Sequence, residues 1–190
     1  MAHARAAFVF VFITVALDML AVGVMIPVLP KLIARFQGGD IALASSTVGL
    51  FGFAWALMQF VFQPVLGAVS DRFGRRPVIL LSNLGLGFDY ILTALAPWLS
   101  FLFAGRLISG VCASSFPTAL AYVSDITPQE QRAGKFGMLG AALGVGFVFG
   151  PAIGGPLGAF DLRAPFWVAA ALYQSSLIST HLPSLGFRWR

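Results

Sequence analysis

Long apolar runs, each about 20 residues in length, are the feature that most restricts how this chain can fold. A run of that length spans the hydrocarbon core of a bilayer as an α-helix, which satisfies its own backbone hydrogen bonds. Of the 190 residues, 58% are hydrophobic and only 10% are charged, whereas a soluble domain is about half apolar and about a quarter charged. The sequence therefore predicts an all-α integral membrane protein.

Six membrane-spanning helices can be placed on the apolar runs. They are predicted at residues 7–29, 47–69, 77–96, 99–121, 136–157 and 165–182. The connecting stretches are short, and no change of composition marks a domain boundary between them. Three segments followed by three more fit an inverted 3+3 repeat, the architecture that builds half of a large class of secondary transporters.

The Lys and Arg residues outside the apolar runs fall mostly on one side of this topology. If the N-terminus is cytoplasmic, that side receives Arg5, Arg72, Arg75, Arg76, Arg132, Lys135, Arg188 and Arg190. The opposite side receives Lys31, Arg35 and Arg163. Cytoplasmic loops carry an excess of positive charge, so this bias predicts a cytoplasmic N-terminus. The net charge of +5 is then a topology signal, and no nucleic-acid partner is expected.

Three ionisable residues lie inside predicted helices: Asp18, Asp89 and Arg106. Such residues cost roughly 2.5–3.5 kcal/mol each at a helix centre, and they indicate a functional site by default. At about 1.5 Å of rise per residue, they lie roughly 16, 18 and 20 Å from the cytoplasmic ends of their helices, in a core about 30 Å thick. All three are expected in one layer near the membrane midplane, where transporters place their sites.

Two interpretations of this layer remain open. In one, Arg106 forms a structural ion pair with one of the aspartates and holds two helices together. In the other, the excess of acid over base leaves a carboxyl group that exchanges a proton near neutral pH, as a proton-coupled carrier requires. The residues do not decide which aspartate has which role. Gln59 is a weaker candidate for the same pathway, because polar side chains in membrane helices more often bond to a neighbouring helix.

The densest cluster of charge is the stretch 67–76, between the second and third predicted helices. Asp71 falls at the C-terminal end of a helix, where the helix dipole disfavours an anion, so it is expected to have a positive partner or to lie near the N-terminus of another helix. Gly74 is expected to permit a tight turn, and Gly67 a close approach to a neighbouring helix.

Glycines recur every four residues along the fifth predicted helix, at Gly146, Gly150, Gly154 and Gly158. This spacing places them on one face, which predicts close packing against a second helix. Pro151 removes a backbone donor and is expected to bend the helix at this point.

Three motifs resemble those of the major facilitator superfamily, in its drug–proton antiporter branch. The first is Gly67-x-x-x-Asp71-Arg72-x-Gly74-Arg75-Arg76. The second is Gly146-x-x-x-Gly150-Pro151-x-x-Gly154-Gly155, and the third is Asp18-x-x-x-x-Gly23-x-x-x-Pro27-x-x-Pro30. Within that branch, residues 8–172 most resemble the bacterial tetracycline efflux proteins, on stretches that include Asp89-Tyr90, Gly105-Arg106 and Asp125-Ile126-Thr127.

The resemblance implies the N-terminal half of a transporter in the bacterial inner membrane, which exports a cationic metal–tetracycline complex in exchange for a proton. It places Asp18, Asp89 and Arg106 on the intramembrane charged positions of the family, and Asp71 and Arg75 in a cytoplasmic gate. It implies no cofactor and no resident metal, since the proton gradient supplies the energy and a divalent metal enters only with the substrate. The chain is then a secondary transporter and not an enzyme.

The polar character of residues 173–190 departs from this family pattern. Seven of the nine side chains from Tyr173 to His181 are polar or semi-polar, which suggests a shifted reading frame or a truncated gene. A half transporter lacks the second wall of its cavity, so we expect little transport from this chain alone. We also expect the glycine face of the fifth helix to meet lipid or a second copy.

Other interpretations stay open beside this one. The chain could be a natural half-size carrier that dimerises, a non-transporting membrane fragment or half-size interaction module, or an exporter of another substrate. An integral-membrane enzyme and an ion channel have little support, because the sequence has neither a metal-spaced histidine cluster nor a selectivity-filter motif.

Overall fold

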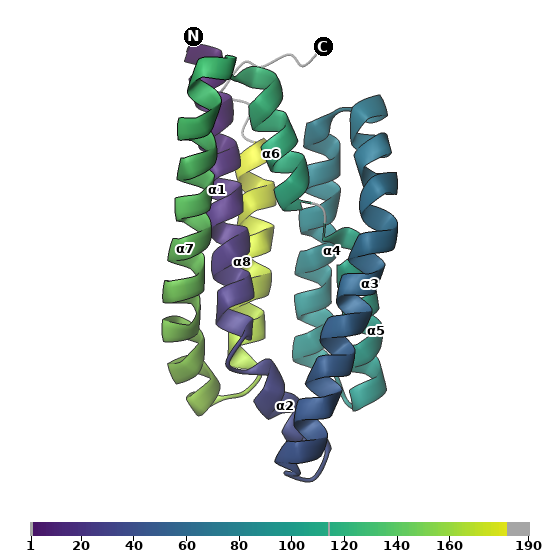
Figure 1. Cartoon of the computed structure of the whole chain (residues 1–190). Helices are drawn as coiled ribbons and strands as arrows, with labels where there is room; N and C mark the ends of the chain where they lie inside the picture. The colour runs from purple at the N-terminus through teal and green to yellow at the C-terminus, as the bar shows by residue number, and fades with distance from the viewer. Residues whose placement is uncertain (1, 114, 182–190) are drawn as a thin grey trace.

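The computed structural model describes residues 2–113 and 115–181, together with the side chains of residues 8–75, 77–113 and 116–175. All regular secondary structure in these residues is helical (Figure 1). The helices are α1 (Ala2–Met25), α2 (Leu29–Phe36), α3 (Ile41–Phe73), α4 (Arg75–Leu95), α5 (Leu99–Cys112), α6 (Ser115–Ile126), α7 (Gln129–Phe160) and α8 (Ala164–His181).

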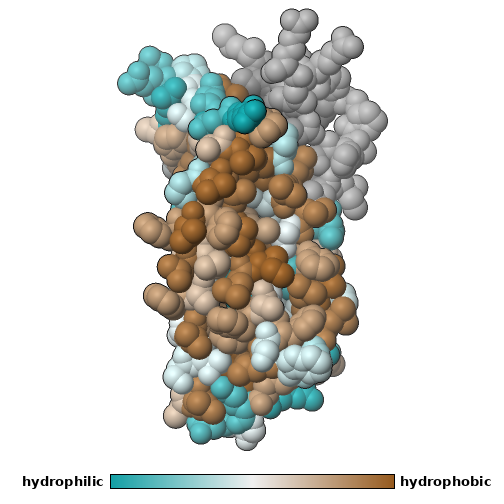
Figure 2. Space-filling model, turned by 90° about the vertical axis from the view of Figure 1, so that its right-hand side faces the viewer, coloured by the Kyte–Doolittle hydropathy of each residue, from teal (hydrophilic) through white to brown (hydrophobic). Residues whose placement is uncertain are grey.

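Five stretches of the described chain are long and apolar enough to cross a membrane. They are Phe8–Phe36, Ile41–Phe73, Pro77–Leu95, Leu99–Ile126 and Gln129–Phe160. Helix α8 runs alongside them as a sixth (Figure 1). On the face shown in Figure 2, apolar side chains form a broad belt around the middle, and hydrophilic side chains gather at the two ends. The prediction of an all-α, six-segment membrane bundle is confirmed.

Two of the predicted segments are interrupted where prolines occur. The first, expected as one helix over residues 7–29, ends at Met25, and the chain continues as the short helix α2. Pro27 lies between α1 and α2, and a proline has no N–H to continue a helix. The fourth, expected over residues 99–121, is divided into α5 and α6, with Pro117 in the first turn of α6.

Two other segments are longer than the predicted ranges 47–69 and 136–157, because α3 and α7 extend beyond them at both ends. The start of α3 is fixed by Asp40, whose side chain accepts a hydrogen bond from the backbone N–H of Leu43 at 3.0 Å. Such an N-cap satisfies a backbone donor that would otherwise lack a partner. The added turns are rich in polar residues, so the hydropathy pattern does not reveal them.

The packing of the helices repeats between the two halves of the chain. Helix α1 packs against α7 as α5 packs against α3, and α1 packs against α8 as α5 packs against α4. The third segments of the two halves, α4 and α8, pack against each other. If the first three segments exchange places with the last three, each of these contacts corresponds to another contact in the set or to itself. Two inverted repeats require this correspondence. The expected 3+3 organisation is therefore visible in the packing.

The glycine face of α7 packs against α1 of the same chain. A Cβ atom added at Gly150 would lie 2.4 Å from the Cα of Gly23, and one added at Gly154 would lie 2.1 Å from the carbonyl oxygen of Val24. Only glycine permits so close an approach. The expectation that this face meets lipid or a second copy is wrong, because α1 covers it. We call Gly146, Gly150, Gly154 and Gly158, together with the facing Gly23, the glycine seam.

Two other members of the helix-five motif lie outside the seam. A Cβ atom added at Gly155 would meet no atom within 4 Å among the described residues. Packing within this chain therefore does not require glycine at that position. Helix α7 continues through Pro151, so this proline does not end the helix.

Two apolar clusters fill the bundle, one on each side of Asp18 along α1. The first contains Phe8 and Val15 of α1, packed with side chains from α4, α6 and α7. The second contains Ala21 of α1 and Val28 just before α2, packed with side chains from α2, α3, α4, α5 and α8. A polar layer around Asp18 thus lies between two apolar halves of the same core.

The glycine seam predicts opposite effects for two neighbouring substitutions. Gly150→Ala is expected to cost about 1–3 kcal/mol of stability, because its methyl group would overlap the backbone of α1. Gly155→Ala is expected to be neutral or to stabilise by up to about 1 kcal/mol, since alanine favours a helix interior and meets no neighbour there. Thermal unfolding of both variants in detergent micelles measures the difference. Equal melting temperatures would contradict tight packing at the seam.

Candidate functional site

The fold buries all three ionisable residues that the sequence places inside helices. Asp18 lies on α1, Asp89 on α4 and Arg106 on α5, with exposed fractions of 1%, 1% and 6%. The charges of all three act on the side chain of Tyr90, so they share one neighbourhood. This neighbourhood is the polar layer between the two apolar clusters.

Arg106 forms an ion pair with Asp89, in which Nη2 donates to Oδ2 of the carboxylate. Its second terminal nitrogen, Nη1, donates to the thioether sulfur of Met25 at 3.1 Å. The guanidinium thereby connects α5 to α4 through a charge and to the end of α1 through a weak contact. Arg106 and Asp89 thus form the ion pair expected in the structural interpretation of the layer, and this pair connects α5 to α4.

Gly105 makes room for this ion pair. A Cβ atom added at Gly105 would lie 2.5 Å from Oδ1 of Asp89, so a larger residue would displace the carboxylate. Among the described residues, Oδ1 of Asp89, Oγ1 of Thr93 and Nε of Arg106 are buried without a protein hydrogen-bond partner. Buried polar atoms of this kind call for a further ligand or water. The layer therefore retains hydrogen-bonding capacity that the ion pair does not use.

Tyr173 completes this neighbourhood, although sequence reasoning assigned it to a divergent tail. Its ring stacks on the ring of Tyr90 with centroids 5.5 Å apart, and its hydroxyl donates to the backbone carbonyl of Asp18 at 3.4 Å. The signal that could have found it is helical spacing, since Tyr173 follows the buried Phe166 and Ala169 of α8 on one face. Polar composition alone concealed that periodicity.

Gln59, the fourth predicted residue of the pathway, bonds to a neighbouring helix. Its Nε2 donates to the backbone carbonyl of Ala113 at 2.9 Å. Ala113 is the C-cap of α5 and lies in the break between α5 and α6. The side-chain amide is thus engaged at the break in the fourth segment rather than with the ion pair.

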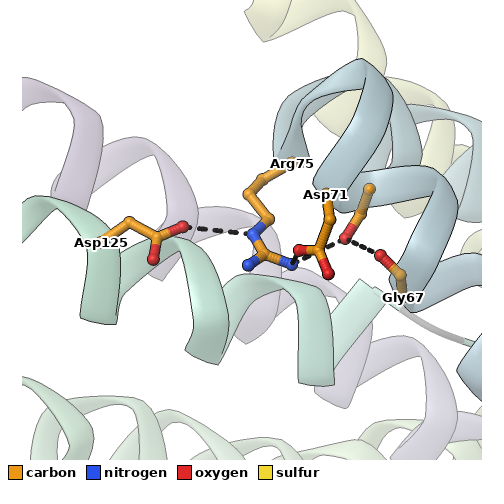
Figure 3. Close-up of polar contacts among 5 residues, drawn as sticks. Gly67, Asp71, Arg75 and Asp125 are labelled. Atoms are coloured by element: carbon orange, nitrogen blue, oxygen red, sulfur yellow. Dashed lines mark hydrogen bonds and ion pairs between the residues drawn. The ribbon is translucent and has the colours of Figure 1, made fainter.

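The charge cluster of residues 67–76 centres on Arg75, which begins α4 and contacts two other helices (Figure 3). Its Nη1 lies 2.6 Å from Oδ1 of Asp71 and 2.8 Å from Oγ of Ser70, both on α3. Its Nε lies 3.2 Å from Oδ2 of Asp125, at the end of α6. The Ser70 hydroxyl in turn donates to the carbonyl of Gly67 at 2.8 Å. Arg75, at the start of α4, therefore ties α3 and α6 together.

The predicted positive partner of Asp71 is confirmed as Arg75. The tight turn expected at Gly74 is also present, since its φ of +97° is a conformation that side chains with a Cβ rarely adopt. The close approach expected at Gly67 is wrong: a Cβ atom there would meet nothing within 4 Å among the described residues. Arg72 is exposed, with its guanidinium 5.4 Å from the ring centroid of Phe73.

Two further observations complete this end of the bundle. The side chain of Arg76 lies outside the described residues. The sequence motifs do not assign a role to Asp125, and only the fold shows that it lies beside Arg75. An acid at the end of an apolar segment, across from a run of arginines, is the signal that could have indicated it.

In the described part of the chain, no cluster brings together three or more His, Cys, Asp or Glu side chains in a way that could hold a metal ion. The polar layer is therefore built from two carboxylates and a guanidinium, with tyrosine rings beside them.

Comparisons with known proteins agree with this architecture. The family model described as Major Facilitator Superfamily matches residues 11–183. The class C tetracycline resistance protein of Escherichia coli is 47% identical over 165 residues, covering 87% of this chain and 41% of that protein. The class E protein of Escherichia coli is 42% identical over 160 residues, covering 84% of this chain and 39% of that protein.

A solved structure gives the same result for the fold. The crystal structure of the human organic anion transporter MFSD10 (TETRAN) superimposes with a TM-score of 0.79 and 26% identity, covering 92% of this chain and 46% of that one. The chain spans about two fifths of the length of the curated relatives it matches. The family match runs past residue 172, beyond the range over which the motifs suggested a resemblance. The six-segment bundle, its charge motifs and this match together show that the chain belongs to the Major Facilitator Superfamily, a family of secondary transporters and not of enzymes.

Proposed function

We propose that this bundle forms one side of a proton-coupled drug exporter whose substrate is a cationic metal–tetracycline complex. The observation that carries the proposal is the burial of Asp18, Asp89 and Arg106 in one layer of an apolar bundle. Charges in such a place are costly and mark substrate or proton pathways. The substrate class rests on the names of two relatives, which are 47% and 42% identical to this chain.

The ion pair offers a physical route for coupling a proton to a cation. While Asp89 is ionised, the Arg106 guanidinium compensates its charge. A proton taken up by Asp89 cancels that charge and weakens the tie between α4 and α5. A cationic substrate near the two carboxylates also compensates their negative charge. In the proposed cycle the proton and the cation therefore alternate at this layer, and neither a cofactor nor a resident metal takes part.

We place the N-terminus on the cytoplasmic side of the bacterial inner membrane. The excess of Lys and Arg at the end where α3 meets α4 supports this orientation. Arg75, which connects α3, α4 and α6 there, then belongs to a cytoplasmic gate. The short helix α2 and Arg163 then lie on the opposite side of the membrane.

A transport path needs a second wall facing this bundle. The curated relatives are longer than this chain, which spans about two fifths of their length. We propose that a second six-helix unit supplies the wall, either as the remaining part of a longer protein or as a second copy. An exporter of another substrate is the second candidate, favoured by the structural match to a protein titled an organic anion transporter.

Uptake by everted membrane vesicles tests the proposal. The chain is expressed alone, and also together with the C-terminal portion of the class C relative, and tetracycline uptake is measured with Mg²⁺ under an imposed pH gradient. We expect saturable uptake in the combined preparation, abolished by a protonophore, and little from the chain alone. Uptake that persists without the gradient, or none in either preparation, would contradict proton-coupled tetracycline export.

The buried ion pair predicts that single and double substitutions do not add. Asp89→Asn or Arg106→Gln alone is expected to cost about 3–5 kcal/mol, because each leaves a buried charge without its partner. The double variant is expected to cost clearly less than the sum, since both charges are gone. Denaturant unfolding in mixed micelles gives the three free energies. Additive losses would mean that Asp89 and Arg106 do not interact.

The contact between Arg75 and Asp125 predicts a different outcome, because it is exposed. Asp125→Asn is expected to change stability by less than about 1 kcal/mol, the range of surface ion pairs. We expect the same variant to change the rate of proton-driven uptake, since it releases α6 from Arg75. Glu130→Gln, an exposed acid at the start of α7, serves as the matched control. Equal uptake rates in the two variants would remove Asp125 from the gate.

A further inference from the structure

The hydrogen bond from Gln59 to Ala113 repairs a defect that a proline creates. In a continuous helix, the carbonyl of Ala113 would accept a hydrogen bond from the backbone N–H four residues later. That position is Pro117, which has no N–H to give. Gln59 Nε2 occupies the free carbonyl at 2.9 Å. A side chain of α3 therefore supplies the donor that the fourth segment lacks.

The break lies between two ion pairs on the same membrane segment. On one side, Arg106 of α5 is paired with Asp89 in the middle of the bundle. On the other side, Asp125 of α6 is paired with Arg75 at the end of the bundle. A helix that lacks a backbone hydrogen bond bends more easily at that point. Helix α6 can therefore change direction while α5 keeps its ion pair.

Two ties that start on α3 lie at the two ends of α6. Gln59 binds the carbonyl of Ala113, the C-cap of α5, two residues before α6 begins. At the far end Asp71 binds Arg75 of α4, which binds Asp125 of α6. Gln59 and Asp71 are 12 residues apart in the sequence, which corresponds to about 18 Å along a helix. Helix α6 has 12 residues, which corresponds to the same length of about 18 Å. The two ties are thus spaced by the length of α6.

Close packing beside the break keeps Gln59 in place. A Cβ atom added at Gly110 would lie 2.6 Å from the carbonyl oxygen of Trp55 and 2.7 Å from the Cβ of Met58. The backbones of α3 and α5 therefore touch one turn before the break. This contact fixes the helix that carries Gln59 relative to α5, and it does not extend to α6, which packs against α1, α4 and α7 instead.

We propose that Gln59 is a positioning residue of the exporter, which anchors α6 at the break so that α6 pivots there when the contact between Arg75 and Asp125 opens. The role rests on the proposed transport function, because the pivot matters only if that end of the bundle opens. Gln59 acts through the position of α6 and does not contact the substrate. The two ties then have different tasks: Arg75 releases α6, and Gln59 retains it.

Amide hydrogen exchange of the chain in lipid nanodiscs tests this role without a transport measurement. Gln59→Leu removes the donor at similar volume. We expect exchange in residues 115–126 to rise about tenfold, the factor for about 1.4 kcal/mol of lost hydrogen bonding, while residues 99–112 remain as in the parent. Gln63→Leu, one turn further along α3, is the matched control and should change neither segment. If Gln59→Leu does not fold, Gln59→Asn replaces it, since its shorter side chain withdraws the same donor.

Pro117→Ala provides the rescue. It restores a backbone N–H opposite the carbonyl of Ala113, so the double variant Gln59→Leu/Pro117→Ala should regain slow exchange in residues 115–126. A bond that merely stabilised the fold would raise exchange in both α5 and α6, and the proline substitution would not reverse it. Either result would overturn the proposal. The proposed drug export is tested separately in vesicles, so the two can fail independently.

Discussion

Asp89 and Arg106 face each other across α4 and α5 in a bundle whose middle is apolar on both sides of them. Apolar side chains and lipid cannot solvate either charge there, so each needs a polar partner. Position 105, next to Arg106, requires glycine because any larger residue would displace the carboxylate of Asp89. The tyrosines of α4 and α8 stack beside the pair. The position of these helices is thus tied to the requirement that one buried charge compensates another.

Buried backbone groups likewise need a polar partner. Where Pro117 leaves a carbonyl without its helical donor, Gln59 provides one from a neighbouring helix. Where the chain turns between α3 and α4, Gly74 adopts a positive φ, and Arg75 binds the acids of two other helices. These irregular points coincide with the residues for which we propose a role in transport. The regular parts of the helices serve mainly to hold them at the correct spacing.

Sequence reasoning could predict features that follow from distance along a helix. The rise per residue placed Asp18, Asp89 and Arg106 at one depth, and the four-residue spacing placed the seam glycines on one face. Features that depend on how a helix is rotated could not be predicted in this way. Among the described residues no atom lies within 4 Å of a Cβ added at the motif glycines Gly67 and Gly155, and the seam meets α1 rather than lipid. Pro117 could have indicated the division of the fourth segment, but the segment was predicted as one helix because its hydropathy is uniform.

The glycine seam also determines when the bundle can be completed during synthesis. Gly23 and Gly146 are 123 residues apart in the sequence. At about 5–20 residues per second, the ribosome needs roughly 6–25 s to make the stretch between them. During that interval α1 is already made while the facing side of α7 does not yet exist, so Gly23 lacks the glycines that pack against it in the folded bundle. Assembly of this bundle therefore waits for its fifth segment, and α1 must remain unpaired along the seam until that segment arrives.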